Sequence, residues 1–148
     1  MISGAIRFMY TTYTDILVPF HDVDSMQVAW HGHYVKYLEV ARCEFLESFN
    51  YSYQAMLESG YAWPVVDMRI KYIKPLRFGQ RVRVQCALRE WEYRLKIDYV
   101  ISDAATGERL TKAYTIQVAV DLATQAMCFE SPLVLRESLT RKLGHLPG

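Results

Sequence analysis

Residues 34–49 read YVKYLEVARCEFLESF, and this stretch decides how the rest of the chain has to fold. Its charged residues recur at steps of two or three, and nearly every residue between them is apolar. They are Lys36, Glu39, Arg42, Glu44 and Glu47. This spacing predicts a helix with one narrow polar stripe and an otherwise covered surface. In a chain of only 148 residues, such a helix needs other elements wrapped around it.

Four stretches with strand periodicity follow this helix. In each of them apolar residues alternate with mostly polar ones, which predicts a strand with one apolar face. The apolar sets are Val66, Met68, Ile70 and Tyr72; Val82, Val84, Cys86 and Leu88; Leu95, Ile97, Tyr99 and Ile101; and Tyr114, Ile116, Val118 and Val120. A first strand is expected around residues 16–20 and a short helix over residues 131–143. The order predicts an α+β fold in which one curved antiparallel sheet wraps around one long central helix.

The composition is that of an ordinary globular domain. Hydrophobic residues make up 51% and charged residues 22%, which excludes a disordered chain. The net charge of +1 gives no general argument for nucleic-acid or membrane binding, and no apolar run reaches the ~18 residues of a membrane-spanning helix. Cys43, Cys86 and Cys128 have neither zinc-type nor disulfide-type spacing. We therefore expect reduced thiols in a cytoplasmic protein.

The charge is distributed less evenly than the total suggests. Residues 69–96 contain nine basic side chains and two acidic ones. Alternation along exposed strands produces such a stretch on any solvated face. It is equally compatible with a docking surface for nucleotide phosphates or for an acidic carrier-protein helix. No nucleic-acid-binding module accompanies it, so nucleic acid is not an expected partner.

Residues 21–34, HDVDSMQVAWHGHY, contain the side chains best suited to chemistry. They join the first predicted strand to the start of the buried helix, where backbone amides are unpaired and the dipole favours negative charge. A carbonyl oxygen at those amides would be polarised as in an oxyanion hole. Asp24, seven residues before His31, can supply a nucleophile or a general base, and Gly32 allows close approach to the backbone. The segment holds the parts of an acyl-transfer site.

Each of these parts also has a structural interpretation. Asp22 and Asp24 can cap the loop or the helix, and His31 and His33 can form local hydrogen bonds only. The His and Asp residues also suggest a metal site, but metal ligands usually come from several elements, so no metal is expected. Spacing alone leaves the catalytic and the structural interpretations open.

The same segment resembles the active-site signature of the hotdog-fold acyl thioesterases. The resemblance is to the 4-hydroxybenzoyl-CoA thioesterase family, and within it to the branch of tol-pal-associated acyl-CoA thioesterases. The signature consists of Asp-x-Asp, a hydrophobic loop, His or Tyr seven residues later, and Tyr three residues further on. Asp22, Asp24, His31 and Tyr34 match it position by position.

The resemblance extends beyond the signature over roughly residues 12–135. Residues 35–42 resemble the family's helix, and residues 65–76 resemble its second strand and the proline turn after it. The family's fold implies a five- or six-stranded antiparallel sheet around the central helix, in a homodimer or homotetramer with sites at subunit interfaces. Residues 1–148 would form a single hotdog thioesterase domain, with 1–11 as an N-terminal extension and 131–148 as a C-terminal helix and tail.

The implied activity is hydrolysis of an acyl-CoA or acyl-carrier-protein thioester, without metal or cofactor. Asp24 takes the position of the family's catalytic carboxylate, and the backbone N–H near His31 would hold the thioester oxygen, with the imidazole of His31 orienting water or thioester. The supporting residues are Asp22, Gly32 and Tyr34. Two positions depart from the family pattern, since Gln27 stands where Gly is common and His33 where Asn is common.

The candidate substrate-binding residues are Trp30, Trp63, Val65, Arg81 and Arg94. The aromatic ones suit an acyl pocket and equally suit a core, and the basic ones would bind coenzyme A phosphates or a carrier protein. Two other functions are possible on the same fold: a 3-hydroxyacyl-thioester dehydratase and a non-catalytic acyl-thioester-binding protein. The presence of Asp24 seven residues before His31 argues against both.

Overall fold

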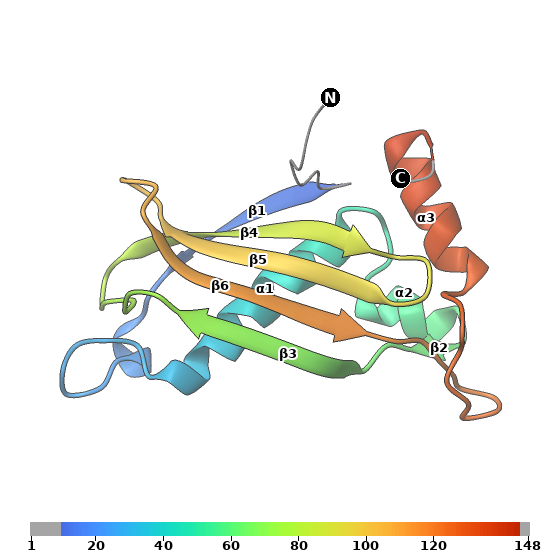
Figure 1. Cartoon of the computed structure of the whole chain (residues 1–148), viewed down its shortest axis with the longest axis horizontal. Coiled ribbons are helices and arrows are strands. Elements are labelled where there is room, and N and C mark those ends of the chain that lie inside the picture. Colours follow the sequence, from blue (N-terminus) through green and yellow to red (C-terminus); the bar gives the residue numbers. More distant parts are fainter. Residues whose placement is uncertain (1–9, 146–148) are drawn as a thin grey trace.

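The structure, a computed structural model, describes residues 10–145 and contains one antiparallel five-stranded sheet that curves across one long helix (Figure 1). The strands follow one another across the sheet in the order β1-β4-β5-β6-β3. Their bounds are β1 Thr11–Leu17, β3 Val65–Tyr72, β4 Arg81–Glu90, β5 Leu95–Asp103 and β6 Arg109–Gln117. The expected α+β architecture is therefore confirmed, with five strands in the main sheet.

The long helix, α1 (Tyr34–Glu47), provides one side of the core, and the sheet provides the other. Leu38, Ala41 and Phe45 are fully buried against inward-facing residues of the sheet, such as Val84 and Ile97. The helix therefore lies where its apolar surface predicts, underneath the sheet.

Arg42 of α1 does not belong to the polar stripe in which the charge spacing places it. Its side chain is only 2% exposed, and its guanidinium donates hydrogen bonds to the hydroxyls of Tyr53 and Tyr99 and to the carboxylate of Glu39. Arg42 is six residues after Lys36, which on a helix puts the two side chains about a third of a turn (~120°) apart around the axis. The charge of the Arg42 guanidinium is therefore stabilised by hydrogen bonds to protein groups.

The first and last long strands differ from their predicted positions. β1 begins at Thr11 and not near residue 16, because it pairs with β4 from Thr11 opposite Ala87 to Leu17 opposite Arg81. Residues 1–9 of the proposed N-terminal extension, and residues 146–148 of the proposed tail, lie outside the described residues. β6 ends at Gln117, three residues before the predicted end.

The faces of β6 are also the reverse of the prediction. Thr115 lies opposite Ile97 on the side of the sheet that faces α1, and it is fully buried. Its hydroxyl shares a 2.6 Å hydrogen bond with the hydroxyl of Tyr99, and the side-chain amide of Gln117 donates to the carbonyl of Trp63 at 2.7 Å. These partners allow polar residues of β6 to face inward.

The remaining elements lie at the far end of α1 from the loop that precedes it (Figure 1). They are α2 (Tyr53–Glu58), the short paired strands β2 (Tyr61–Ala62) and β7 (Val120–Asp121), and α3 (Leu133–Leu143). The helix expected over residues 131–143 is confirmed as α3, whose Arg136 lies 5.3 Å from the ring of Trp91 after β4. None of the helices within residues 10–145 is long and apolar enough to cross a membrane.

Candidate functional site

The loop between β1 and α1 is a tight hairpin. The amide of Asp24 donates to the carbonyl of Val28 at 2.9 Å, and the amide of Trp30 donates to that of Asp22 at 3.0 Å. The hairpin is tied to the connection between β3 and β4, since the amide of Ala29 donates to the carbonyl of Leu76 at 2.7 Å. The loop is thus held by backbone hydrogen bonds at its base and on one side.

Asp24 lies exposed at the start of the hairpin turn. Its Oδ1 accepts a hydrogen bond from the amide of Met26 at 2.8 Å and a longer one, 3.5 Å, from Val28. Its Oδ2 accepts none from the part of the chain that the structure describes. Asp24 therefore fits both the structural and the chemical interpretation: one oxygen fixes the turn, and the other has no hydrogen-bond donor among residues 10–145.

Asp22, two residues earlier, has the opposite environment. It is 1% exposed and accepts hydrogen bonds from Lys36 Nζ at 2.6 Å and from the hydroxyl of Tyr37 at 2.7 Å. Burial alone would raise the pKa of Asp22, but these hydrogen bonds and the nearby Lys36 charge lower its pKa overall. Asp22 is a buried anchor that ties the hairpin to the first turn of α1.

The sequence does not single out Lys36 as a candidate residue, and it presents Tyr37 only as an aromatic residue of the acyl pocket or the core, not as a hydrogen-bond donor to Asp22. The signal that could have found them is their place in the first turn of the predicted helix, where side chains face the preceding loop. Tyr37 in turn has its pKa raised by burial and by its hydrogen bond to Asp22, so its hydroxyl remains a donor.

A one-turn 3₁₀ helix, η2 (His31–His33), connects the hairpin to α1. The amide of His33 donates to the carbonyl of Trp30, whereas the amides of His31 and Gly32 have no acceptor within residues 10–145. The carbonyl of His31 accepts a 3.0 Å hydrogen bond from the hydroxyl of Tyr72. Two free N–H groups at the start of a helix form a natural site for an oxyanion.

The space that a side chain at Gly32 would occupy is filled by the indole of Trp30. A Cβ atom at this position would lie 2.1 Å from the indole of Trp30, which packs directly on the Gly32 backbone. Trp30 itself is 52% exposed and stacks beside the imidazole of His31, with ring centroids 4.9 Å apart. These contacts form a partly open aromatic cover beside the free amides.

A shallow cavity of about 260 Å³ opens next to His31. Its walls include Tyr34 and Tyr72, whose rings meet edge to face at 4.7 Å. The buried hydroxyl of Tyr34 accepts a hydrogen bond from the amide of Leu76 at 3.1 Å, and burial raises its pKa. Tyr34 is therefore a fixed, neutral wall of the cavity.

Trp63 and Val65 lie far from this cavity in the same protomer. Val65 begins β3 and Tyr72 ends it, so about 23 Å of strand separates the two positions at 3.3 Å per residue. The structure does not bring Trp30 and Trp63 together in one chain.

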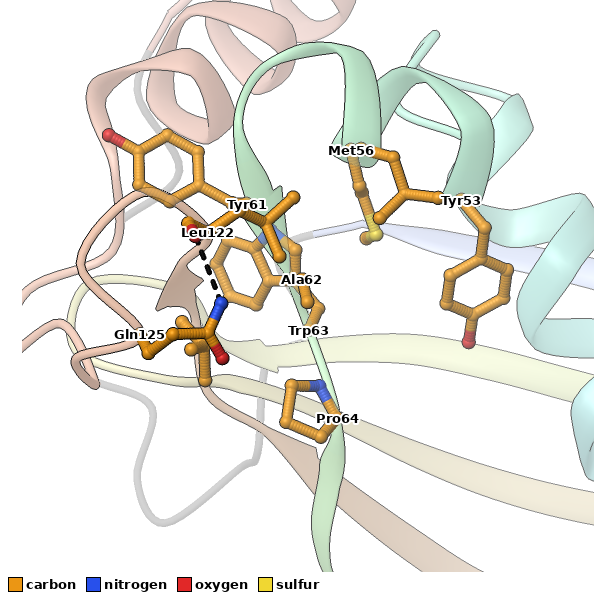
Figure 2. Close-up of a pocket in the computed structure, with 10 residues that line it drawn as sticks. Tyr53, Met56, Tyr61, Ala62, Trp63, Pro64, Leu122 and Gln125 are labelled. Carbon is orange, nitrogen blue, oxygen red and sulfur yellow. Dashed lines mark hydrogen bonds between the residues drawn. The ribbon is translucent and has the colours of Figure 1, made fainter.

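Trp63 instead lines a second, apolar cavity of about 420 Å³ (Figure 2). The cavity lies between α2, β2 and the turn that follows β7. Figure 2 shows Met56 and Tyr53 on one side and Leu122 with Gln125 on the other; the side-chain amide of Gln125 donates to the carbonyl of Leu122 at 2.9 Å. The indole N–H of Trp63 donates to the hydroxyl of Tyr51 at 3.1 Å. The cavity has the size and apolar lining of a small-molecule site.

The two basic residues predicted to bind substrate, Arg81 and Arg94, lie outside the loop of residues 21–34. Arg94 forms an ion pair with Glu90 at 2.8 Å, and Arg81 is an exposed residue at the start of β4. Other members of the basic stretch are also paired, Arg83 with Asp15 and Lys74 with Glu108. No group of three His, Cys, Asp or Glu side chains suited to a metal ion occurs in the described part of the chain.

Comparison with known proteins gives consistent results. A family model described as the thioesterase-like superfamily matches residues 18–143. A Bacillus subtilis protein named "Putative acyl-CoA thioesterase" is 29% identical over 114 residues, which cover 76% of this chain and 82% of that protein. An acyl-CoA thioester hydrolase of Escherichia coli is 31% identical over 70 residues, which cover 47% of this chain and 52% of that protein.

Solved structures share the fold. The 1,4-dihydroxy-2-naphthoyl-CoA thioesterase from Synechocystis superposes on 92% of this chain and 99% of its own with a TM-score of 0.80, at 24% sequence identity. The expected hotdog fold is thereby confirmed.

Proposed function

The chain belongs to the thioesterase-like superfamily, and on that premise we propose that it hydrolyses acyl-CoA thioesters to a free acid and a thiol. One observation carries the proposal: a single loop holds a carboxylate oxygen that accepts no hydrogen bond, and two amides that donate none, within the part of the chain that the structure describes. Hydrolysis of a thioester needs both parts, a group that activates the attacking oxygen and donors for the oxyanion. The signature ending in His31 and Tyr34 further supports the 4-hydroxybenzoyl-CoA branch of the superfamily.

In the proposed reaction the thioester carbonyl oxygen accepts hydrogen bonds from the amides of His31 and Gly32. Asp24 takes a proton from a water molecule, whose oxygen adds to the carbonyl carbon to give a tetrahedral oxyanion. The oxyanion collapses, the C–S bond breaks, and the leaving thiolate takes up the proton that Asp24 received from water, which restores the carboxylate. Direct attack by Asp24 on the carbonyl carbon is the alternative first step. It breaks the C–S bond, expels the thiolate and gives an acyl-enzyme anhydride, and water then cleaves this anhydride to the free acid and the Asp24 carboxylate.

We propose that the complete site is formed by two protomers. β3 is an edge strand with free backbone hydrogen-bonding groups, and Val66 on it is 57% exposed. Antiparallel pairing of β3 with β3 of a second copy would put the Val65 end of one strand beside the Tyr72 end of the other. The Trp63 cavity of one protomer would then adjoin the His31 cavity of its partner. This arrangement supports a homodimer as the smallest active unit.

In this dimer the acyl group extends away from the free amides of one protomer and into the apolar cavity of the other. The cavity of about 420 Å³ is large enough for an acyl chain or an aromatic acid. Coenzyme A is the carrier that the name of the Bacillus subtilis relative supports, and an acyl carrier protein is the second carrier to be tested.

The test is thiol release from a panel of short, long and aromatic acyl groups, each presented on coenzyme A and on a carrier protein. Asp24→Asn should lower kcat at least 100-fold, because general-base catalysis contributes about 10²–10⁴-fold. Asn keeps the Oδ1 acceptor of the turn, so the fold should persist.

Asp103→Asn is the matched control, since Asp103 caps the turn after β5 through its own Oδ1 and two backbone amides. Its kcat should remain within about twofold of wild type. Equal rates for wild type and Asp24→Asn would contradict the assignment of Asp24. A folded protein that releases no thiol from the whole panel would point to the dehydratase or the binding module.

A further inference from the structure

The outer face of the sheet, directed away from α1, carries a hollow of about 440 Å³. Side chains from β3, β4, β5 and β6 line it, and its charged members are Arg69, Lys71, Arg89, Lys96, Lys112 and Asp98. Five cations and one carboxylate thus surround one concavity. Along each strand these charged residues alternate with the residues that pack on α1. The sheet itself therefore separates the hollow from the core and from the catalytic loop.

The positive charge in this hollow is largely uncompensated. Lys71 and Lys112 are directly opposite each other in the β3–β6 pair, an arrangement that costs stability when nothing neutralises it. Neither of them, nor Arg69, forms an ion pair with any residue among 10–145. Elsewhere on the strands the basic residues have carboxylate partners, as Arg83 has in Asp15.

The single carboxylate does little to balance these cations. Asp98 lies 4.0 Å from the Arg89 Nε, and burial raises its pKa against the influence of Lys96 and Arg89. Lys96 lies 4.6 Å from the centroid of the Tyr114 ring, which forms part of the floor. The hollow therefore offers an aromatic surface surrounded by cations.

We infer that this hollow binds a compact organic phosphate with two or more phosphate groups. Arg presents a rigid fork of donors to phosphate oxygens and Lys a point charge. The hollow contains both kinds, Arg69 with Lys71 and Lys112, and these three form no ion pair with the residues that the structure describes. A concave, low-dielectric surface concentrates the field of its charges, and the volume lies in the range of small-molecule sites. A pair of phosphates would also remove the repulsion between Lys71 and Lys112.

The phosphates could come from two sources with the same chemistry. One is the phosphorylated end of the coenzyme A substrate, in which case the inference rests on the proposed function. The other is a free nucleotide that binds independently of the reaction. Pairing of two β3 edges leaves the hollow open in either case, because strand pairing uses the backbone edge and not this face.

Binding is measured by calorimetry on the full chain at constant ionic strength. The probes are ADP, adenosine 3′,5′-bisphosphate, coenzyme A and pantetheine, and an acidic carrier protein is titrated separately. We expect the three phosphate compounds to bind and pantetheine not to bind. The double variant Arg69→Gln/Lys112→Gln should weaken phosphate binding at least tenfold. It should melt no lower than wild type, because it removes like-charge repulsion; Lys71→Gln alone provides a second test.

The control is Arg141→Gln/Lys142→Gln, which removes the same charge from the last turn of α3 and should change the Kd by less than twofold. If the double variant raises KM for an acyl-CoA tenfold and leaves KM for the same acyl-pantetheine unchanged, the phosphates belong to the substrate. If the double variant loses ADP binding but keeps the wild-type KM for the acyl-CoA, the ligand is a separate nucleotide. The binding measurement supports the phosphate site even if the protein hydrolyses no thioester.

Three results would overturn the inference. They are no binding of any phosphate compound to the wild type, equal binding to wild type and double variant, and binding of an acidic carrier protein in place of the phosphate compounds.

Discussion

At the residue scale, Asp22 and Asp24 show how two carboxylates with nearly the same sequence context acquire different roles. Asp22 faces α1 and accepts hydrogen bonds from Lys36 and Tyr37, whereas Asp24, at the start of the hairpin turn, keeps one oxygen without a donor among residues 10–145. On an extended strand, two residues of an Asp-x-Asp motif would lie on the same side. Here they do not share a side, because Asp22 ends a one-turn 3₁₀ helix (Phe20–Asp22) and Asp24 begins the hairpin turn. One carboxylate can therefore anchor the loop while the other remains available to a substrate.

The lowered pKa of Asp22 makes stability depend on pH in a defined direction. A carboxyl group with a lower pKa in the folded state stabilises the protein above its unfolded pKa, about 3.9, and loses that contribution as pH falls through the folded value. Asp22→Asn should cost about 2 kcal/mol at pH 7, or roughly 4–8 °C in Tm. The difference in Tm between wild type and variant should shrink below about pH 4. A difference that stays constant from pH 7 to pH 3 would show that Asp22 is not ionised through these contacts.

Gln27 has a left-handed backbone conformation, with φ of 66°, at the position where the family commonly has Gly. A side chain in this region costs energy that Gly avoids. Gln27→Gly should therefore raise the free energy of unfolding by about 0.5–1 kcal/mol in urea titrations. Gly79→Ala is the reciprocal test, since Gly79 has φ of 78° and no atom within 4 Å of an added Cβ; it should be destabilising. A loss of stability in Gln27→Gly would contradict this account.

At the scale of elements, α1 and β6 show where sequence patterns lead to correct and to wrong predictions. The extent of α1 follows from its apolar spacing, because a 3.6-residue period is visible over 14 residues. The inward direction of Thr115 and Gln117 cannot be predicted from the spacing of residues in β6. Their hydrogen-bond partners, Tyr99 and Trp63, come from other elements. Alternation identifies a strand but not which of two mixed faces is buried.

Arg42 provides the test of the polar contacts under the sheet. Arg42→Ala should lower the free energy of unfolding by about 3 kcal/mol, because it leaves a cavity and takes away the donor to the buried hydroxyl of Tyr99. Arg42→Met refills the volume and should cost only about 1 kcal/mol. Chemical denaturation measures both. If the Ala variant were as stable as wild type, the Arg42 hydrogen bonds would contribute nothing to the fold.

At the scale of the whole molecule, some residues in and around the candidate site are adjacent in the sequence, and others are brought together only by the fold. The loop of residues 21–34 could be predicted from the sequence because its parts are adjacent. The counter-charge of Arg83 could not, because Asp15 is 68 residues away. The separation of Trp30 from Trp63 follows from the length of β3, and sequence alone gives no measure of it.

The two-protomer site makes activity depend on the β3 edge. Val66→Arg should convert a dimer of 17.3 kDa chains into monomers in light scattering and reduce thioester hydrolysis at least tenfold, since charges on an edge strand oppose pairing. Tyr13→Arg, on the exposed face of β1, is the control and should leave both properties unchanged. A fully active monomer would show that one chain contains the whole site.

The position of α1 in the chain order has a consequence for synthesis on the ribosome. The helix is complete at Glu47, but the strand that finishes its cover, β6, ends about 70 residues later at Gln117. At 5–20 residues per second, this interval lasts about 4–14 s. β1 also remains unpaired during this time, because its partner strand β4 begins only at Arg81. Throughout this period the growing chain displays its most apolar surface, and a chaperone that recognises such segments has seconds in which to bind.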